Sequence, residues 1–261
     1  MMPNRPEYMA IWLGLCSIGV TVALINTQLR GHSLAHCLDI AVAKHVIAAA
    51  EYNAELRTAT AQMENPPQIW VHGDDGNQYE RIDRAVEHFS GESLTPAERR
   101  ATTIADRALL IYTSGTTGLP KAANVSHRRL LQWSFWFAGL MNTGPGDRMY
   151  DCLPMYHSVG GVVATGAVLV RGGSVLIRDK FSARRFWDDI AEWDCTLFQY
   201  IGELARYLHN APQAPRERAP SAAPLLRQRA SRRRLGEVPE AVRYSAHHRV
   251  LCSDRGQRLA L

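Results

Sequence analysis

The chain has 261 residues, of which 46% are hydrophobic and 21% charged, so it can bury the core of a globular protein. Its five cysteines are scattered without a CxxC pair, which argues against a zinc site and indicates a reducing compartment with mostly buried thiols. The net charge of +5 is unevenly placed. Residues 220–261 hold nine arginines and three acidic residues, a charge of +6, which leaves −1 for residues 1–219.

The uncharged run over residues 9–29 is long enough to suggest a membrane span or a signal peptide. Its first part has the apolar spacing of a helix and ends at Gly19, whereas "VTVALIN" is typical of a buried strand. The single basic residue before the run, Arg5, is offset by Glu7, so a signal peptide would lack its positive region. We therefore predict a helix followed by a strand.

Helices and strands are expected to alternate along residues 1–219, with a polar surface excursion over residues 78–98. This alternation predicts an α/β fold, a doubly wound and mostly parallel sheet flanked by helices, in which ligands lie at the carboxyl ends of strands. Further helices are predicted over 33–43, 127–141, 160–170, 182–193 (capped by Ser182) and 203–209. Further strands are predicted over 45–50, 68–72, 108–113, 148–154, 174–178 and 195–200.

The alternation stops at Ala219, and residues 220–261 show no sustained helix or strand period. We expect a disordered, arginine-rich tail. A nucleic-acid-binding arm is the alternative, but neither an aromatic context nor a fold context supports it.

A glycine loop, "IYTSGTTGLPK" over residues 111–121, follows one of the predicted buried strands. Its backbone N–H groups, hydroxyls and lysine can converge on one anion, so the residues predict a phosphate loop that serves a nucleotide. The spacing matches neither GxxxxGK[ST] nor GxGxxG. A flexible surface loop without a ligand is the alternative.

"YTSGTTGLPKAA" resembles the phosphate-binding motif of the adenylate-forming (AMP-binding) superfamily. The stretches "NRPEYMAIWLGLCSIGVTVALINTQLRGHSLAHCL", "LPMYHSVGG" and "FQYIGELARYLHNAP" resemble its fatty acid transport protein or very-long-chain acyl-CoA synthetase branch. The resemblance covers about residues 1–219. It implies a partial N-terminal domain of the adenylate-forming fold.

The resemblance implies a long- or very-long-chain fatty acid–CoA ligase that uses ATP, Mg²⁺ and coenzyme A. The fatty carboxylate attacks the α-phosphate of ATP to give acyl-adenylate and pyrophosphate, and the thiol of coenzyme A then displaces AMP. The partners implied are these small molecules and no nucleic acid. The implied place is the cytoplasm, with peripheral membrane association and a link to fatty acid uptake.

The resemblance also assigns site residues, and no protein ligand to a metal. Tyr156 and His157 would line the adenylate and acyl pocket, although His157 also fits an ordinary loop histidine. Gly160 and Gly161 would leave room for the acyl chain. The β- and γ-phosphates would be held by Thr113, Ser114, Gly115, Thr116, Thr117, Gly118 and Lys121, with Lys121 and Thr116 catalytic. Tyr200, Gly202 and Glu203, in "QYIGE" at residues 199–203, would lie beside the acyl pocket and adenine.

The later motifs of this family are absent as the sequence reads, and its first residues resemble a stretch well inside the family's N-terminal domain. Permitted codons for residues 249–261, "RVLCSDRGQRLAL", read one base later, give EFYAATEGNVSL, which resembles the family's Thr-Glu motif. "LLRQRASRRRLG" gives CCGNGLRGDVW in the same way. We therefore expect a frameshift near Ala219 or Pro220, with a partial AMP-binding domain at 1–219 and an unrelated tail at 220–261.

The chain as read is then expected to have little or no ligase activity. Two other functions remain open at this point. One is a remnant that binds a nucleotide or a fatty acid without catalysis, and the other is a membrane-associated component of fatty acid uptake.

Overall fold

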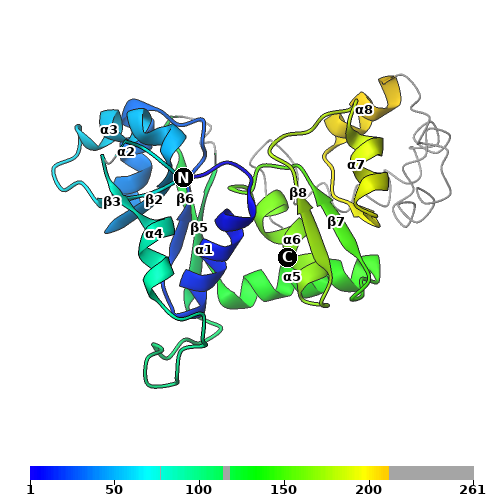
Figure 1. Ribbon diagram of the computed structural model, residues 1–261, viewed down its shortest axis with the longest axis horizontal. Helices are drawn as coiled ribbons and strands as arrows, with labels where there is room; N and C mark the ends of the chain where they lie inside the picture. The colour runs from blue at the N-terminus through cyan, green and yellow to red at the C-terminus, as the bar shows by residue number, and fades with distance from the viewer. Residues whose placement is uncertain (77, 114–117, 212–261) are drawn as a thin grey trace. The chain divides into compact units, whose positions relative to one another are not determined.

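Helices and strands alternate along the computed structural model, which describes residues 1–76, 78–113 and 118–211 (Figure 1). The chain divides into two units, Met1–Leu130 and Leu131–Leu261. Among the described residues, five strand pairings are parallel and one is antiparallel. The predicted α/β class with mostly parallel pairing is therefore confirmed. The predicted tail at 220–261 lies outside the described residues.

The first unit holds two sheets of three strands each, in the orders β1-β5-β6 and β2-β3-β4. In the first sheet β1 pairs with β5 in parallel, and β5 pairs with β6 as an antiparallel hairpin. The second sheet is parallel throughout. The strands are β1 (Val22–Leu24), β2 (His45–Ala49), β3 (Gln68–His72), β4 (Glu80–Arg81), β5 (Arg107–Thr113) and β6 (Lys121–Ser126).

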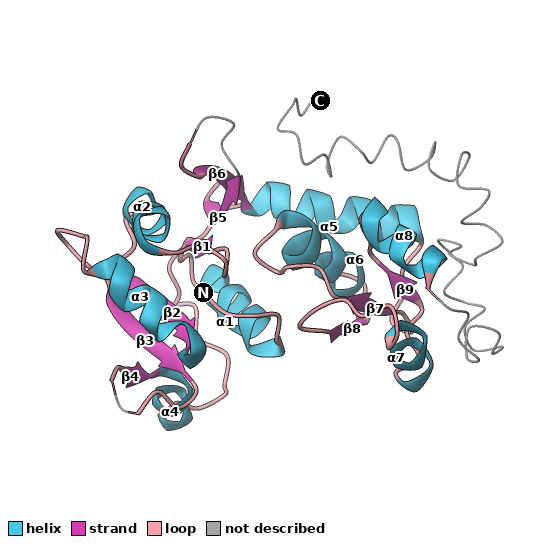
Figure 2. Ribbon diagram, turned by 90° about the horizontal axis from the view of Figure 1, so that it is seen from above, coloured by secondary structure: helices cyan, strands magenta, loops and turns pink. Residues whose placement is uncertain are grey.

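Four α-helices accompany these sheets, and two of them build the core of the first unit. α2 and α3 contribute Leu34, Leu38 and Leu56 to one buried cluster with Val46 of β2, and Figure 2 shows α3 beside β2 and β3. Apolar faces at helical spacing drive this packing. The helices are α1 (Pro6–Ser17), α2 (Gly31–Ile40), α3 (Asn53–Thr60) and α4 (Ile82–Ala85), with 3₁₀ turns η1 (Ala50–Tyr52) and η2 (Val86–His88).

The described part of the second unit, up to residue 211, has one parallel sheet in the order β8-β7-β9. Tyr150 of the central strand is fully buried and meets Phe186 and Phe198 edge to face, which centres one core cluster on β7. The elements are α5 (His127–Met141), which begins in the first unit, β7 (Arg148–Asp151), the π-helix η3 (Val159–Ala164), α6 (Thr165–Leu169), β8 (Ser174–Ile177), α7 (Phe186–Glu192), β9 (Leu197–Phe198) and α8 (Gly202–Asn210).

The uncharged run at residues 9–29 contains α1 and β1, as predicted. α1 carries a proline at its first position, where the missing N–H costs nothing, and Gly19 just beyond its end has a φ of 78°. Within the part of the chain that the structure describes, no helix is both long enough and apolar enough to span a membrane.

Several element predictions differ from the structure. The described strands form three small sheets rather than one doubly wound sheet. α3 and β6 were not predicted, because α3 is polar and short and β6 is largely exposed. The helix expected to start at Ser182 begins at Phe186 instead, and its N-cap position, Arg185, makes no side-chain capping bond.

Candidate functional site

The glycine loop joins the two strands of the β5–β6 hairpin. Tyr112 pairs with Ala122 and Thr113 with Lys121, so the hairpin ladder closes directly at the loop. We call Tyr112 and Thr113 the first stem of the loop, and Pro120 and Lys121 its second stem. Thr113 Oγ1 donates a long hydrogen bond of 3.4 Å to the carbonyl oxygen of Lys121, which joins the stems.

The structure describes only part of the predicted phosphate site. Thr113 and Lys121 are both exposed, so their side chains are free to meet a ligand from solvent. Gly118 has a φ of 147°, a conformation that side-chain-bearing residues rarely adopt, and no atom crowds the position of a Cβ there. Ser114, Gly115, Thr116 and Thr117 lie outside the described residues.

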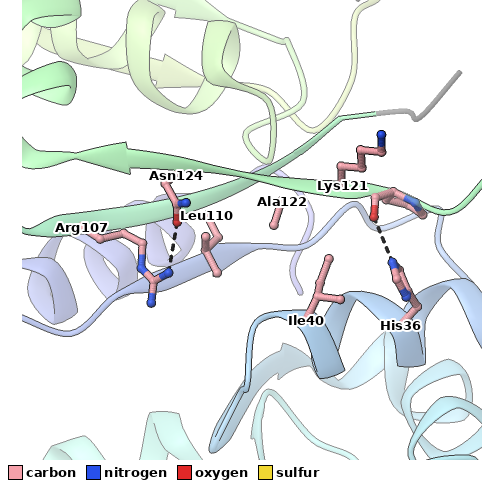
Figure 3. A pocket seen from close by; sticks show the side chains of 8 residues that line it. His36, Ile40, Arg107, Leu110, Lys121, Ala122 and Asn124 are labelled. Atoms are coloured by element: carbon pink, nitrogen blue, oxygen red, sulfur yellow. Dashed lines mark hydrogen bonds between the residues drawn. The ribbon is translucent and has the colours of Figure 1, made fainter.

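An open groove of about 390 Å³ lies between the hairpin and α2 (Figure 3). Arg107 crosses one end of it and donates to Asn124 Oδ1 at 3.1 Å. Figure 3 shows the Lys121 ammonium group directed away from His36 and Ile40, which come from α2 on the other side of the strand. The groove is lined by His36, Ile40, Arg107, Leu110, Pro120, Lys121, Ala122 and Asn124, none of them acidic.

Two hydrogen bonds join α2 to the stems of the glycine loop. His36 Nε2 lies 3.1 Å from the carbonyl oxygen of Pro120, and Tyr112 Oη donates to the carbonyl oxygen of Cys37 at 2.6 Å. Burial raises the pKa of the Tyr112 phenol, so it stays protonated and remains a donor. Neither contact could be predicted from the sequence, because the partners are 84 and 75 residues apart.

In the second unit, Tyr156 and His157 follow the carboxyl end of β7. Their rings lie 4.6 Å apart between centroids and are tilted by 53°. Tyr156 is half-buried and His157 is exposed, and the N–H of His157 donates to the carbonyl oxygen of Pro154 at 3.1 Å. An aromatic and an imidazole group therefore stand together at the strand end where the predicted fold expects a ligand.

Gly160 and Gly161 are buried in η3, where both lie directly against backbone carbonyl groups, and their part in an acyl pocket stays a prediction. A Cβ on Gly161 would lie 1.9 Å from the carbonyl oxygen of Met155, and one on Gly160 would lie 2.6 Å from that of Pro154. The glycines thus let the "LPM" backbone pack directly on the helix. This packing fixes the segment that carries Tyr156 and His157.

The third predicted group lies at the start of α8. Tyr200 packs against the buried cluster around Tyr150, and burial raises the pKa of its phenol. Gly202 begins α8 with no atom near a Cβ position. Glu203 accepts hydrogen bonds from Tyr207 Oη at 2.8 Å and from Arg206 at 3.3 Å, so its carboxylate is held by its own helix.

Sequence reasoning missed the buried aspartate at the end of β7. Asp151, the last residue of β7, is fully buried, and its Oδ1 accepts the N–H of Leu153 at 3.1 Å, while Oδ2 has no hydrogen-bond partner among the described residues. Burial raises the pKa of its carboxyl to about 8. The available signal was an aspartate directly after the apolar "MY" of a predicted strand.

Metal ligands were not predicted, and the described residues contain no group of three His, Cys, Asp or Glu side chains that could hold an ion. Mg²⁺ therefore stays an implication of the resemblance, without assigned protein ligands.

Comparison with solved structures supports the fold. The ATP-bound MatB from Rhodopseudomonas palustris superposes with a TM-score of 0.72 at 23% identity, over 85% of this chain and 42% of that one. The N-terminal domain of FACL13 from Mycobacterium tuberculosis gives a TM-score of 0.68 at 22% identity, over 83% and 53%. At this level of identity the likeness establishes the fold alone.

Comparison with curated proteins is closer in sequence. Long-chain fatty acid transport protein 1 from Rattus norvegicus is 39% identical over 220 residues, which are 83% of this chain and 34% of the relative. The very long-chain fatty acid transport protein from Cochliobolus heterostrophus is 33% identical over 217 residues, 83% of this chain and 32% of the relative. The chain thus spans about a third of the length of these relatives.

The sequence model of the AMP-binding enzyme family matches residues 1–254. This match covers most of the chain, and the glycine loop, the α/β architecture and the curated relatives agree with it. The chain belongs to the AMP-binding enzyme family, in its fatty acid transport protein branch.

Proposed function

We propose that this sequence carries the ATP loop of a ligase that joins a long- or very-long-chain fatty acid to coenzyme A. The observation that carries the proposal is the β5–β6 hairpin, which closes at the family's phosphate motif and presents Thr113 and Lys121 to solvent. The fatty acid transport proteins among the relatives support a long acyl chain as the substrate class.

In the proposed reaction, a carboxylate oxygen of the fatty acid forms a bond to the α-phosphorus of ATP, and pyrophosphate leaves with the electron pair of the broken bond. The sulfur of coenzyme A then attacks the acyl carbon, AMP leaves, and the thiol proton goes to solvent. Such phosphoryl chemistry depends on positioning and charge neutralisation. Bound Mg²⁺ would supply part of that neutralisation.

The protein groups proposed for the first step are those of the glycine loop. Lys121 would place its ammonium group against the β- and γ-phosphates, and the loop hydroxyls and N–H groups would hold the remaining oxygens. Thr116 is proposed to act beside Lys121. Tyr156 and His157 are proposed to line the adenylate and acyl pocket, with Tyr200, Gly202 and Glu203 beside it.

We further propose that the chain as it reads binds ATP without completing ligation. The support is that the family's later motifs do not occur in this sequence. No residue of the sequence as read is assigned to activate the α-phosphate, so bound ATP would not proceed to the adenylate. The chain itself would then be a nucleotide-binding protein without catalytic activity. Its nucleotide site would still derive from that of an active ligase of the family.

Measurements of ATP binding and of pyrophosphate exchange distinguish a nucleotide-binding chain from a catalytically active one. In calorimetric titrations we expect the wild-type chain to bind ATP, and Lys121→Ala to weaken ATP binding by tenfold or more while AMP binding is unchanged. Exposed Lys44→Ala is the matched control and should bind like the wild type. A wild type that binds no ATP would overturn the nucleotide site. Exchange of labelled pyrophosphate into ATP with a long-chain fatty acid would instead show that the chain forms the acyl-adenylate.

The two domains expected from the sequence remain a proposal, a partial AMP-binding domain at 1–219 and a frameshifted tail at 220–261. Both shifted motifs arise in the same frame, one base after the frame as read, and this supports a single shift. Pairwise matches cover 81–84% of the chain, whereas the family match extends to residue 254. Sequencing the gene around codon 219 tests this proposal. If the frame one base later lacks the codons of the Thr-Glu motif, the frameshift is ruled out.

We propose a cytoplasmic place of action with peripheral membrane association. Flotation of the chain with anionic liposomes tests the second part. Recovery of the chain entirely at the bottom of the gradient would count against membrane association and against a direct part in fatty acid uptake.

A further inference from the structure

Helix α2 contacts both stems of the glycine loop from two neighbouring residues. The side chain of His36 meets the carbonyl oxygen of Pro120 on the second stem, and the backbone carbonyl of Cys37 receives the hydroxyl of Tyr112 on the first. Figure 3 shows the His36 contact rising from α2 to the strand that leads out of the loop.

The chemistry of these contacts fixes their direction. A carbonyl oxygen can only accept, so His36 Nε2 must carry the hydrogen, either in the Nε2–H tautomer or as imidazolium. Tyr112 is the donor on the other side, because Cys37 offers its carbonyl. Each bond joins the helix to the residue next to Thr113 or Lys121, the paired ends of the hairpin.

α2 is itself a fixed support. Leu34, Cys37 and Leu38 are at most 2% exposed and belong to the main buried cluster of the first unit. At the start of the helix, Arg30 donates to the carbonyl oxygen of Thr27 at 2.7 Å and pairs with Glu55 of α3 at 3.2 Å. The helix can therefore restrict the motion of the loop stems that it contacts.

We propose that α2 clamps both stems of the glycine loop, and that His36 and Tyr112 are positioning residues for the groups that bind the nucleotide phosphates. The proposal rests on the function proposed above. The clamp would hold Thr113 and Lys121 at a set separation before ATP arrives, so less ordering is needed on binding. Neither residue touches the phosphates.

The first test measures the clamp without any nucleotide. Hydrogen exchange of the β6 amides is compared in wild type, His36→Leu, and His36→Gln, whose amide nitrogen can replace the Nε2 donor. We expect faster exchange in His36→Leu and wild-type exchange in His36→Gln. His32→Leu, at an exposed position of the same helix, is the matched control. Equal exchange in all four proteins would overturn the clamp.

The second test measures its effect on the ligand, with ATP and AMP as probes. His36→Leu should bind ATP about three- to tenfold more weakly, the effect of one lost hydrogen bond, with AMP affinity unchanged and ATP affinity restored in His36→Gln. Tyr112→Phe keeps the buried ring and should show the same ATP-specific loss, which guards against a misfolded His36 variant.

The outcomes separate the two proposals. A wild type that binds no ATP but shows the expected exchange pattern would refute the phosphate site and leave the clamp standing. Variants that melt like the wild type and keep its ratio of ATP to AMP affinity would refute the positioning role.

Discussion

Gly161 shows, at the scale of one residue, that backbone packing alone can require a glycine in a sequence motif. Its Cβ position lies 1.9 Å from the carbonyl oxygen of Met155, a distance that no side chain can occupy. The two glycines of "YHSVGG" therefore allow close contact between η3 and the preceding loop. The sequence showed the glycines and the resemblance, but this backbone contact exists only in the folded chain.

We accordingly expect Gly161→Ala to destabilise the second unit by about 3 kcal/mol or more, since a carbonyl group of the backbone must move. Gly139→Ala is the matched control: Gly139 is exposed in the last turn of α5, with nothing near its Cβ position, and alanine there should stabilise by up to about 1 kcal/mol. Urea denaturation measures both. A Gly161→Ala protein as stable as the wild type would contradict the packing argument.

Asp151 gives a prediction of pH dependence. Its carboxyl has an ordinary pKa of 3.8, which burial raises to about 8, so the unfolded chain binds fewer protons than the folded chain between these values. The contribution of this group to folding is therefore most favourable below pH 4 and declines as the pH rises to 8, by an amount on the order of several kcal/mol.

The variant Asp151→Asn keeps an acceptor for the N–H of Leu153 and cannot ionise. Relative to the wild type, we expect its unfolding free energy to gain steadily from pH 5 to pH 8, measured by urea titration at each pH. Asp39→Asn, at an exposed site, should run parallel to the wild type. A constant difference between Asp151→Asn and the wild type would exclude a buried neutral carboxyl.

At the scale of elements, helices and strands with a clear apolar pattern could be predicted from the sequence, but the pairing of strands could not. β3 and α5 match their predicted bounds because alternation and helical spacing are local properties. β6 was missed because it is mostly exposed and is held by its antiparallel partner β5, and the division into three sheets depends on contacts distant in sequence. The glycine loop could be located from its motif, but its support by α2 could not.

The ion pair between β8 and α7 is another contact of this kind. Asp189 is 3% exposed and receives two bonds from Arg178, which follows β8, and one from Tyr150 Oη at 3.3 Å. We expect Arg178→Met to cost about 3–5 kcal/mol, because it leaves a buried carboxylate without its main partner, Arg185 being 3.9 Å away.

Thermal unfolding of Arg178→Met is compared with that of Arg206→Met, which breaks the exposed pair with Glu203 and should cost about 0–1 kcal/mol. Similar melting temperatures for the two variants would mean that Asp189 is adequately paired without Arg178.

At the scale of the whole molecule, the buried cysteines report on each unit separately. Cys37 belongs to the core cluster of the first unit, and Cys152 and Cys195 belong to one in the second. Burial raises the pKa of these thiols to about 11 for Cys37 and about 12 for the other two, so the reactive thiolate is scarce in the folded state. All three should resist alkylation until their own core opens.

Because each cluster draws on one unit, we expect damage to the second core to leave the first protected. In the Gly161→Ala variant, alkylation by iodoacetamide under native conditions, mapped by peptide mass spectrometry, should label Cys152 and Cys195 much faster than in the wild type. Cys37 should keep its wild-type rate. If Cys37 is labelled together with the other two, the units unfold as one cooperative structure, and the glycine loop in the first depends on the integrity of the second.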